Sequence, residues 1–260
     1  MNTNAYSFAV CVFLALAAGV NAQTLNLFSV TQQARSTTSF FGGNPLPQIT
    51  DEWSGAFNLG VTGTTTGSSS LPNPGLESSA NGSLLANHFF SGTSWALSGD
   101  SMATFDAGLG NPGSVNPTIS SSSLLSGEYF FTVDSPAQIT LNATVMNQFL
   151  GLGPVLGFNG ATVALYAVAI DGVFVDQYLV NWQSSLGSNG GTYSTTLSSG
   201  VFRLEAQTTS WAQSNVPDAF GTATSSYDLQ LSVAPIPEPS GALLALLGGG
   251  WFLGLRRRRA

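Results

Sequence analysis

Charge is scarce in this 260-residue sequence. Only 7% of its residues are charged, against about 25% in ordinary soluble domains, and lysine is absent. Between Thr24 and Ala234, twelve carboxylates stand against two arginines, Arg35 and Arg203, which gives that stretch a net charge of −10. A field of this sign repels phosphate backbones, and no basic cluster in the stretch offsets it. The composition therefore argues against a nucleic-acid partner.

Cysteine and histidine are equally rare. The one cysteine, Cys11, lies in an N-terminal apolar run, so the rest of the chain has no thiol for a disulfide, a zinc site or a nucleophile. The one histidine, His88, would have to serve any Ser-His-Asp site, and no Gly-x-Ser-x-Gly motif accompanies it. These absences favour a non-enzymatic protein that holds no cofactor.

Carboxylates are the remaining candidates for chemistry. Glu52, Glu128 and Glu205 could supply the acid pair of a glycoside hydrolase, because such pairs meet in space rather than in sequence. Calcium is the metal that an all-oxygen ligand set would take, although no regularly spaced Asp/Asn loop is present. The aspartates considered as its ligands form two pairs, Asp100 with Asp106 and Asp171 with Asp176.

Aromatic and hydroxyl side chains indicate two further functions. In "YLVNW", alternation predicts that Tyr178, Val180 and Trp182 share one strand face, where Trp182 and Tyr178 would contact a glycan. The segment "TGTTTG", residues 62–67, is one irregular instance of the threonine array that ice binding requires. The other tryptophans before the C-terminal segment are expected in the core or on a sugar-stacking surface: Trp53, Trp95 and Trp211.

The N-terminus has the features of a secretory signal peptide. An apolar stretch from Phe8 to Val20 has the length of a signal h-region and is too short to span a bilayer comfortably. Val20-Asn21-Ala22 fits the small-x-small cleavage rule. We therefore expect a signal peptide over residues 1–22, cleaved between Ala22 and Gln23.

The C-terminus combines three features in a fixed order. Pro237-Glu238-Pro239-Ser240 is followed by an uncharged apolar segment, residues 241–255, and then by Arg256, Arg257, Arg258 and Arg259. The prolines keep their segment extended and accessible to a protease. The segment 241–255 is expected to form a marginal transmembrane helix. The arginines act as a cytoplasmic stop, which leaves the body outside.

These three features resemble the PEP-CTERM sorting signal of Gram-negative bacteria, over residues 235–260. The resemblance implies processing by exosortase, a membrane-embedded cysteine protease-transpeptidase, after export through the secretion translocon. It also implies association with exopolysaccharide and biofilm matrix. The protein would be held transiently in the inner membrane and would then reach the cell surface, the outer envelope or the extracellular matrix.

Between the two targeting segments, residues 23–234 show a period of two rather than 3.6. Residues 138–145, 201–207 and 227–233 alternate apolar and polar side chains. Residues 161–170 are almost continuously apolar, as in a central strand covered on both faces. Asp171-Gly172 then predicts a type I′ hairpin turn.

Other stretches are interpreted as connections. Residues 62–75 are expected to form a loop or a disordered excursion, and residues 188–191 and 151–157 turns, because they are rich in Gly, Ser and Pro. Residues 110–123 are expected to be a linker or a long connection between halves of one sandwich.

The predicted fold class is all-β, an antiparallel β-sandwich or jelly roll of one domain with decorated loops. Residues 128–207 loosely resemble the jelly-roll modules related to bacterial pre-peptidase C-terminal domains. The leading functional hypothesis is a non-enzymatic, exported envelope or matrix protein. A carbohydrate-binding module at the same location is the alternative, followed by a glycoside hydrolase or an ice-binding protein.

Overall fold

The computed structural model describes residues 24–41, 48–55, 61–72, 79–107, 118–184, 187–216 and 218–236. Within these ranges no helix is long and apolar enough to cross a membrane. The signal peptide, its cleavage position at Ala22 and Gln23, and the sorting segment 237–260 lie outside the described residues. They stay predictions.

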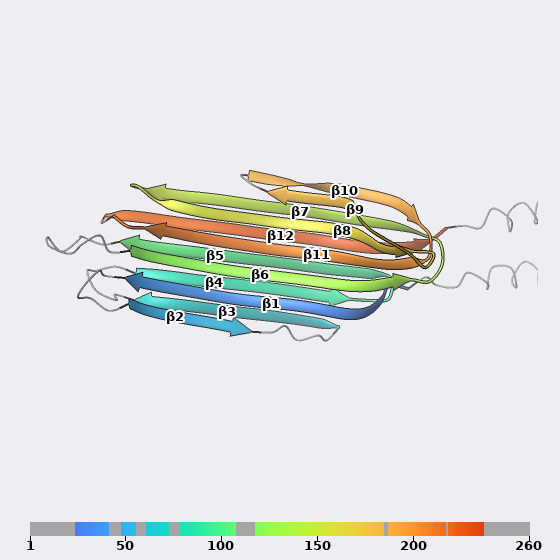
Figure 1. Ribbon diagram of the computed structural model, residues 1–260, viewed down its shortest axis with the longest axis horizontal. Coiled ribbons are helices and arrows are strands. Elements are labelled where there is room, and N and C mark those ends of the chain that lie inside the picture. Colours follow the sequence, from blue (N-terminus) through green and yellow to red (C-terminus); the bar gives the residue numbers. More distant parts are fainter. Residues whose placement is uncertain are drawn as a thin grey trace, which may run out of the picture.

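The described residues form twelve strands in two six-stranded sheets (Figure 1). The first sheet has the order β2-β1-β6-β11-β8-β9 and the second sheet the order β10-β7-β12-β5-β4-β3. Every neighbouring pair is antiparallel, so the predicted antiparallel sandwich is confirmed. The strands are β1 (Asn26–Phe41), β2 (Gln48–Gly55), β3 (Thr62–Pro72), β4 (Ser79–Phe90), β5 (Ser94–Ala107), β6 (Thr118–Val133), β7 (Ala137–Leu152), β8 (Leu156–Ile170), β9 (Val173–Ser184), β10 (Gly187–Leu197), β11 (Gly200–Ser214) and β12 (Ala219–Pro235).

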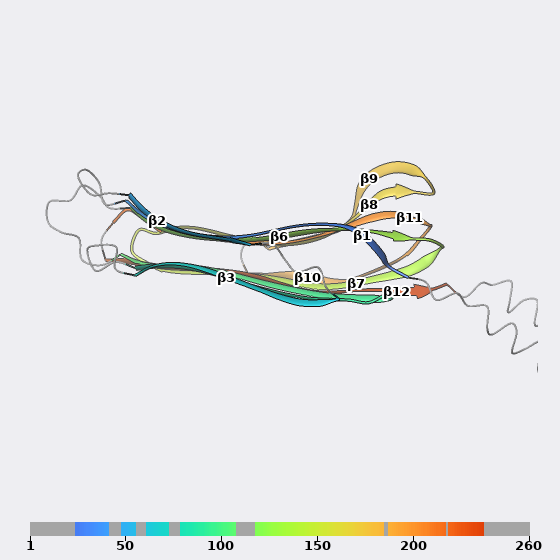
Figure 2. The same cartoon turned by 90° about the horizontal axis from the view of Figure 1, so that it is seen from below.

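Each sheet combines strands from both halves of the chain. In the first sheet β1 pairs with β6, and β6 pairs with β11. In the second sheet β5 from the first half pairs with β12, the last strand. The described strands therefore belong to one sandwich, which is elongated along the strand direction (Figures 1 and 2).

The alternation in the sequence correctly indicates which side chains face the interior. In β7, Ile139, Leu141, Ala143 and Val145 are buried, while the alternate residues face outward. The same holds for the predicted apolar faces of β11 and β12. In β8 the successive residues 163–167 are all buried, as predicted for a strand covered on both faces, and on the outer face Tyr166 is covered by Tyr178 and Arg203.

The predicted hairpin turn is confirmed at the end of β8. Asp171 and Gly172 both have positive φ, 49° and 79°, which is the backbone of a type I′ turn. The β8–β9 hairpin that follows bends away from the second sheet, as Figure 2 shows.

Three stretches predicted as connections lie in strands, so these predictions are wrong. Residues 62–72 form β3, the edge strand beside β4, and residues 188–191 lie within β10, the edge strand beside β7. Residues 118–123, expected in a linker, begin β6. The Gly, Ser and Thr side chains of all three stretches give little hydropathy contrast, and the edge strands β3 and β10 need backbone hydrogen bonds from only one neighbour.

The interior consists of two apolar clusters separated by a polar zone. The larger cluster lies toward the β8–β9 turn, and its large members include Trp95, Phe131 and Phe202. The smaller cluster lies toward the opposite end, and its large members are Phe40, Phe105 and Ile119. Between them seven buried serines, here called the serine belt, point inward from both sheets: Ser36, Ser69, Ser101, Ser121, Ser123, Ser210 and Ser225.

The serine belt connects the two sheets by hydrogen bonds. Ser123 Oγ of the first sheet donates to the carbonyl of Met102 in the second, at 2.9 Å. Ser225 Oγ of the second donates to the carbonyl of Thr209 in the first, also at 2.9 Å. Such bonds require the sheets to approach closely, and Figure 2 shows the two layers nearest each other in the middle of the molecule.

Candidate functional site

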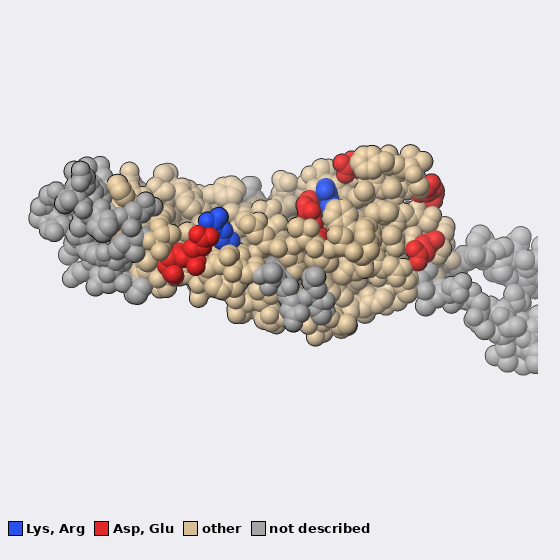
Figure 3. Space-filling view, turned by 60° about the horizontal axis from the view of Figure 1, so that its bottom comes forward, with Lys and Arg blue, Asp and Glu red and all other residues tan. Residues whose placement is uncertain are grey.

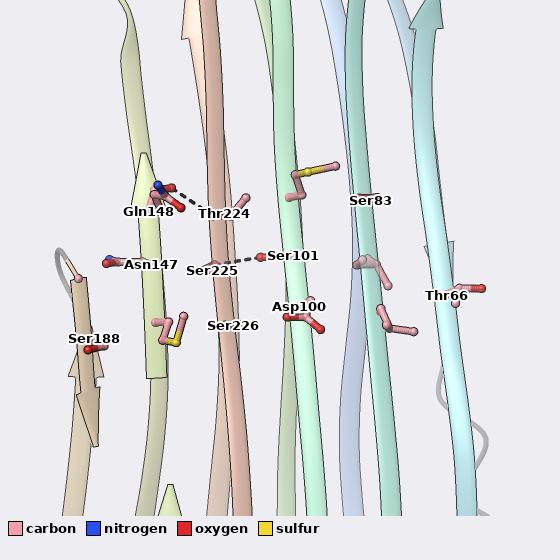
Figure 4. A pocket seen from close by; sticks show the side chains of 15 residues that line it. Thr66, Ser83, Asp100, Ser101, Asn147, Gln148, Ser188, Thr224, Ser225 and Ser226 are labelled. Atoms are coloured by element: carbon pink, nitrogen blue, oxygen red, sulfur yellow. Dashed lines mark hydrogen bonds between the residues drawn. The ribbon is translucent and has the colours of Figure 1, made fainter. Parts of the chain in front are cut away.

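A shallow groove of about 860 Å³ crosses the outer face of the second sheet. It runs over all six strands of that sheet, as Figure 4 shows for the labelled side chains. Nine of its fifteen lining residues carry hydroxyl or amide side chains, among them Thr66, Ser188 and Gln148, although most of the exposed lining surface is apolar. The site is therefore rich in groups that both donate and accept hydrogen bonds.

The groove lies directly above the serine belt. Ser101 and Ser225, two members of the belt, also line the groove from the strands below it. Small side chains let the second sheet sink toward the first, whereas the bulky clusters at each end hold the sheets apart. The inward serines thus account for the concave outer face.

Apolar side chains cover part of the groove surface. Leu85, Met102 and Met146 point outward from β4, β5 and β7, and each is at least one-third exposed. Exposed thioether and alkyl groups of this kind offer an adaptable apolar surface to a ligand. The groove therefore combines hydrogen-bonding walls with apolar contact.

One carboxylate stands in the groove. Asp100 lies on β5 directly opposite Ser226 of β12, and Asp228 is the next outward residue on β12. Partial burial, and to a smaller extent the negative charge of Asp228, raises the pKa of Asp100 above its usual value. The Asp100 carboxylate is thus incompletely solvated, which makes it a strong acceptor for hydroxyl groups.

A second hollow of about 400 Å³ continues the groove along three strands. Asn142, Thr192, Asp228 and Gln230 line it, and Asn142 already accepts a hydrogen bond from Thr192 at 2.7 Å. On β12 the outward positions pass from Ser226 in the first hollow to Asp228 in the second. Together the hollows form one polar track on this face.

Charge is sparse over the molecule and gathers in small groups. Figure 3 shows a face that is mostly uncharged, with two places where cationic and anionic side chains meet. In the described residues the two arginines are both paired: Arg35 Nε lies 2.8 Å from Glu52 Oε1, and Arg203 Nη2 lies 3.6 Å from Glu205 Oε1. The described surface therefore offers few unpaired charges and many neutral polar groups.

The structure separates the two predicted glycan contacts. Tyr178 is 57% exposed, whereas Val180 and Trp182 pack against the larger apolar cluster. The register with β8 shifts between Leu165 and Tyr166, where Val180 and Tyr178 are the partners. This bulge interrupts the alternation, so the prediction that Tyr178, Val180 and Trp182 share a face is wrong.

The remaining tryptophans occupy three kinds of position. Trp95 is fully buried in the core. Trp53 packs against the core at the β2–β3 edge, with its ring against Gly67. Trp211 points outward from β11 directly opposite Phe158 of β8, which is 60% exposed. None of the three lies in the groove.

Two of the three candidate glutamates come together. Glu205 of β11 and Glu128 of β6 are direct cross-strand partners on the outer face of the first sheet, and Glu205 accepts a hydrogen bond from the Tyr166 hydroxyl. Glu52 instead pairs with Arg35 elsewhere on that face. The Glu128–Glu205 pair lies outside both hollows.

The other polar candidates are dispersed. His88 is buried in the interior and stacks on Phe90 at 5.1 Å between ring centroids. Asp100 and Asp106 are six residues apart on one strand, about 20 Å at the usual rise per residue. Among the described residues, no group of three or more His, Cys, Asp or Glu side chains could hold a metal ion.

The threonines of "TGTTTG" form a single row. Thr62, Thr64 and Thr66 point outward from the edge strand β3. Their partners on β4 are Phe89, Asn87 and Leu85, so the row does not continue as threonine on the next strand.

Sequence reasoning missed the groove. Its residues come from six strands and are separated by up to 160 positions, from Thr66 to Ser226. The one local signal is the repeated serine at inward positions, as in residues 120–123, which resembles a polar loop when taken alone.

Comparison with known proteins gives no family for this chain. No protein-family model matches the sequence, and no curated protein does. Among solved structures, "Structure of infectious bursal disease virus Gx strain" is 9% identical with a TM-score of 0.18, and covers 89% of this chain and 90% of that chain. "Crystal structure of infectious bursal disease virus VP2 subviral particle" is 10% identical with a TM-score of 0.19, and covers 95% and 94%. Likenesses this weak carry no functional argument.

Proposed function

We propose that this protein is an exported, non-enzymatic component of the cell envelope or biofilm matrix, whose body associates with exopolysaccharide. The observation that carries the second half of this proposal is the polar track on the second sheet. It offers neutral hydroxyl and amide groups, one incompletely solvated carboxylate at Asp100, and apolar contact from Met102 and Met146. Sugars present the matching combination of hydroxyl groups and apolar ring faces.

The charge of the body favours uncharged polysaccharide. Asp100 and Asp228 lie in the two connected hollows, and none of the residues that line either hollow is basic. An anionic chain would meet repulsion there without a compensating cation. A neutral polysaccharide would exchange its hydrogen bonds with water for bonds to the hollows and cover apolar surface as well.

The sorting half of the proposal depends on the C-terminal sequence. Pro237-Glu238-Pro239-Ser240 would be the exosortase site, residues 241–255 the temporary inner-membrane helix, and Arg256–Arg259 the cytoplasmic stop. A charge at the centre of a membrane helix costs about 2.5–3.5 kcal/mol, so four arginines together oppose translocation. After processing, the body would remain at the surface or in the matrix.

Cell fractionation tests the sorting half. Replacing the four terminal arginines with serine should release protein that retains its tail into the periplasm or medium. Changing Glu238 to alanine should instead hold full-length protein in the inner membrane. Antibodies to the body and to the tail distinguish these outcomes. Normal processing and location of the arginine-free variant would contradict the proposal.

A binding assay tests the polysaccharide half. Ser226→Arg places a long side chain in the groove directly opposite Asp100, where it can pair with the carboxylate and fill the space. The variant should fold normally and bind neutral polysaccharide at least about tenfold more weakly, a loss of about 1.4 kcal/mol. Thr50→Arg, on an exposed position of edge strand β2 outside both hollows, is the control.

The Glu128–Glu205 pair gives a specific reason to test hydrolysis as a second candidate. A carboxylate pair is the machinery of most glycoside hydrolases. Release of reducing ends from a polysaccharide by the wild type, and its loss in Glu205→Gln, would establish that activity and replace the non-enzymatic proposal.

A further inference from the structure

The outer face of the first sheet carries a continuous row of large side chains. Phe130, Arg203, Tyr166 and Tyr178 come from β6, β11, β8 and β9, four neighbouring strands, and each is the direct cross-strand partner of the next. We call these four residues the aromatic platform. It lies on the opposite face of the sandwich from the groove.

Ring contacts hold the aromatic platform together. The Tyr166 and Tyr178 ring centroids are 4.2 Å apart, and the Arg203 guanidinium carbon lies 4.0 Å from the Tyr166 centroid. Arg203 also lies 6.0 Å from the Phe130 centroid. Two rings beside the guanidinium, and a third ring packed on Tyr166, restrict the rotamers of all four side chains, so the surface that they present is pre-organised.

Tyr178 is the exposed end of this row. Tyr166 beneath it is buried, whereas Tyr178 is 57% exposed. An aromatic ring in this position presents a large apolar surface while its hydroxyl can still bind water or a ligand. Its contact with the tilted Tyr166 ring already restricts the Tyr178 side chain, which lowers the entropy lost when a ligand binds.

A second row of polar side chains runs beside the aromatic platform. Glu128 and Glu205 are cross-strand partners, and Glu205 is bonded to the Tyr166 hydroxyl and paired with Arg203. Like charges directly opposite each other destabilise a sheet. Two facing carboxylates beside the aromatic platform are therefore costly for stability alone, and they are suited to accept hydrogen bonds from ligand hydroxyl groups.

The chemistry of this face selects among ligands. Glu128 and Glu205 outnumber Arg203, so a polyanion would be repelled. Charged groups at its centre oppose burial against an apolar protein surface. A neutral oligosaccharide fits both parts, because one ring can stack on Tyr178 while hydroxyls of the neighbouring rings bond to the glutamates, which lie two and three strands away.

We infer that the aromatic platform is a second carbohydrate-binding site, and that the protein cross-links polysaccharide chains by using its two opposite faces. This inference rests on the proposed function, because the groove supplies the other site. Two sites on one rigid sandwich can hold two polysaccharide chains at a fixed separation. They can also bind one long polysaccharide chain at two places, which increases the avidity.

Native gel electrophoresis of the full-length protein in detergent measures binding. The gels contain hydroxyethyl cellulose, dextran, xylan or alginate as the probe. The wild type should be retarded by at least one of the three neutral polymers and not by alginate. Tyr178→Ala should bind at least about fivefold more weakly, and Tyr178→Phe, which keeps the ring, should bind nearly as the wild type. Glu128→Gln should weaken binding without lowering the melting temperature, since it removes the repulsion with Glu205.

Viscosity of the same polymer solution measures cross-linking. The wild type should raise the viscosity, whereas Tyr178→Ala and the groove variant Ser226→Arg should each still bind but raise it little. The double variant should not bind.

The possible failures are distinguishable. Absence of retardation of the wild type by all four polymers overturns the proposed function together with this inference. If Tyr178→Ala raises the viscosity as much as the wild type does, the cross-linking inference is overturned and the proposed function is not. If Tyr178→Ala does not bind the polymer at all while Ser226→Arg binds normally, the aromatic platform is the one binding site. That result overturns cross-linking. The Tyr178→Ala result counts only if the circular dichroism spectrum and melting temperature of this variant are close to those of the wild type. If Tyr178→Ala unfolds, the test uses Glu128→Gln instead. Unchanged polysaccharide binding by Glu128→Gln then overturns the assignment of the aromatic platform as a binding site.

Discussion

At the scale of the residue, serine takes the place that an apolar side chain usually holds in a sandwich interior. A buried hydroxyl costs free energy unless it has a partner. In the serine belt that partner is a backbone carbonyl of the facing sheet or another belt serine, as for Ser123 and Ser225. The belt therefore fixes both the spacing of the sheets and the hollow above them.

Ser210 tests this role of the belt. Its hydroxyl donates to the Ser101 carbonyl at 2.9 Å and lies 3.0 Å from the Ser101 and Ser225 hydroxyls. Ser210→Ala should lower the free energy of unfolding by about 1–2 kcal/mol. Ser210→Val should cost about 2–4 kcal/mol, because its extra methyl group also forces the sheets apart. Urea denaturation measures both, and the exposed Ser29→Ala is the control. A stability loss no larger for valine than for alanine would contradict the close approach.

Asp100 provides a prediction about pH. Its pKa is raised in the folded protein, first by partial burial and then by the charge of Asp228. A raised carboxyl pKa contributes stability at low pH that is lost as the pH rises through the folded value. Asp100→Asn should therefore stabilise the protein at pH 7, by less than about 1 kcal/mol because the group is largely exposed. The gain should vanish near pH 3. Urea midpoints at the two pH values measure it, with Asp106→Asn as the comparison, and a gain that persists at the lower pH would refute the explanation.

At the scale of the element, period-two patterns predict the fold wherever inward positions are apolar and outward ones polar. The contrast between Ile139 or Phe202 and their neighbours was enough to assign strand and face. Residues 62–72 and 188–191 lack this contrast, because hydroxyl residues and glycine occupy both faces. The two edge strands were therefore taken as connections.

The candidate site was predicted less well than the fold. Tyr178 was singled out from the sequence, but the bulge that turns Trp182 to the other face has no local signal. Cross-strand neighbours such as Arg203 and Tyr166 are 37 residues apart, and only the order of strands in the sheet brings them together. The groove depends likewise on the approach of the two sheets, which alternation does not encode.

Edge strand β10 provides the prediction at this scale. Gly190 has a φ of 138°, and a Cβ atom there would lie 2.2 Å from the Ala143 carbonyl oxygen of β7. Gly190→Ala should therefore detach β10 and destabilise the protein by more than about 1 kcal/mol. Faster amide hydrogen exchange over residues 187–197, with β12 unaffected, is the expected measurement.

Gly172→Ala is the matched control for that experiment. Gly172 also has a positive φ, 79°, but nothing lies within 4 Å of its added Cβ. The loss in the free energy of unfolding should be about 1 kcal/mol, and amide hydrogen exchange should increase only around the β8–β9 turn. Equal loss of protection in β10 from both variants would mean that the contact with Ala143 is not what keeps β10 paired.

At the scale of the whole molecule, the sandwich has two chemically distinct outer faces and an interior divided by the serine belt. The groove and the aromatic platform occupy opposite faces, and each is built across neighbouring strands rather than on loops. A site on paired strands is held in place by the entire sheet. Its function should therefore last as long as the sandwich stays folded, and conditions that unfold the core should abolish binding on both faces together.

The buried phenols of the larger apolar cluster determine one such condition. Burial raises the pKa of Tyr129 to about 12, although a hydrogen bond from Gln32 partly opposes this shift. Burial, and then the charges of Tyr129 and Asp100, also raises the pKa of Tyr227. In the unfolded chain both phenols ionise near pH 10. Their contribution to stability is thus intact below about pH 10 and is lost as the pH rises through the folded values.

The expected outcome is alkaline unfolding with a definite slope. Between about pH 10 and about pH 12 each buried phenol should reduce the free energy of unfolding by up to about 1.4 kcal/mol per pH unit. Tyr129→Phe leaves the Gln32 amide without its acceptor, so the variant should be less stable than the wild type at pH 7. It should nevertheless lose stability less steeply above pH 10, because one titrating group has been removed. Urea denaturation across this range, together with phenolate absorbance, measures both effects. Parallel pH profiles for the wild type and Tyr129→Phe would show that Tyr129 ionises in the folded state as easily as in the unfolded chain, and the interior would then be more open to water than its packing indicates.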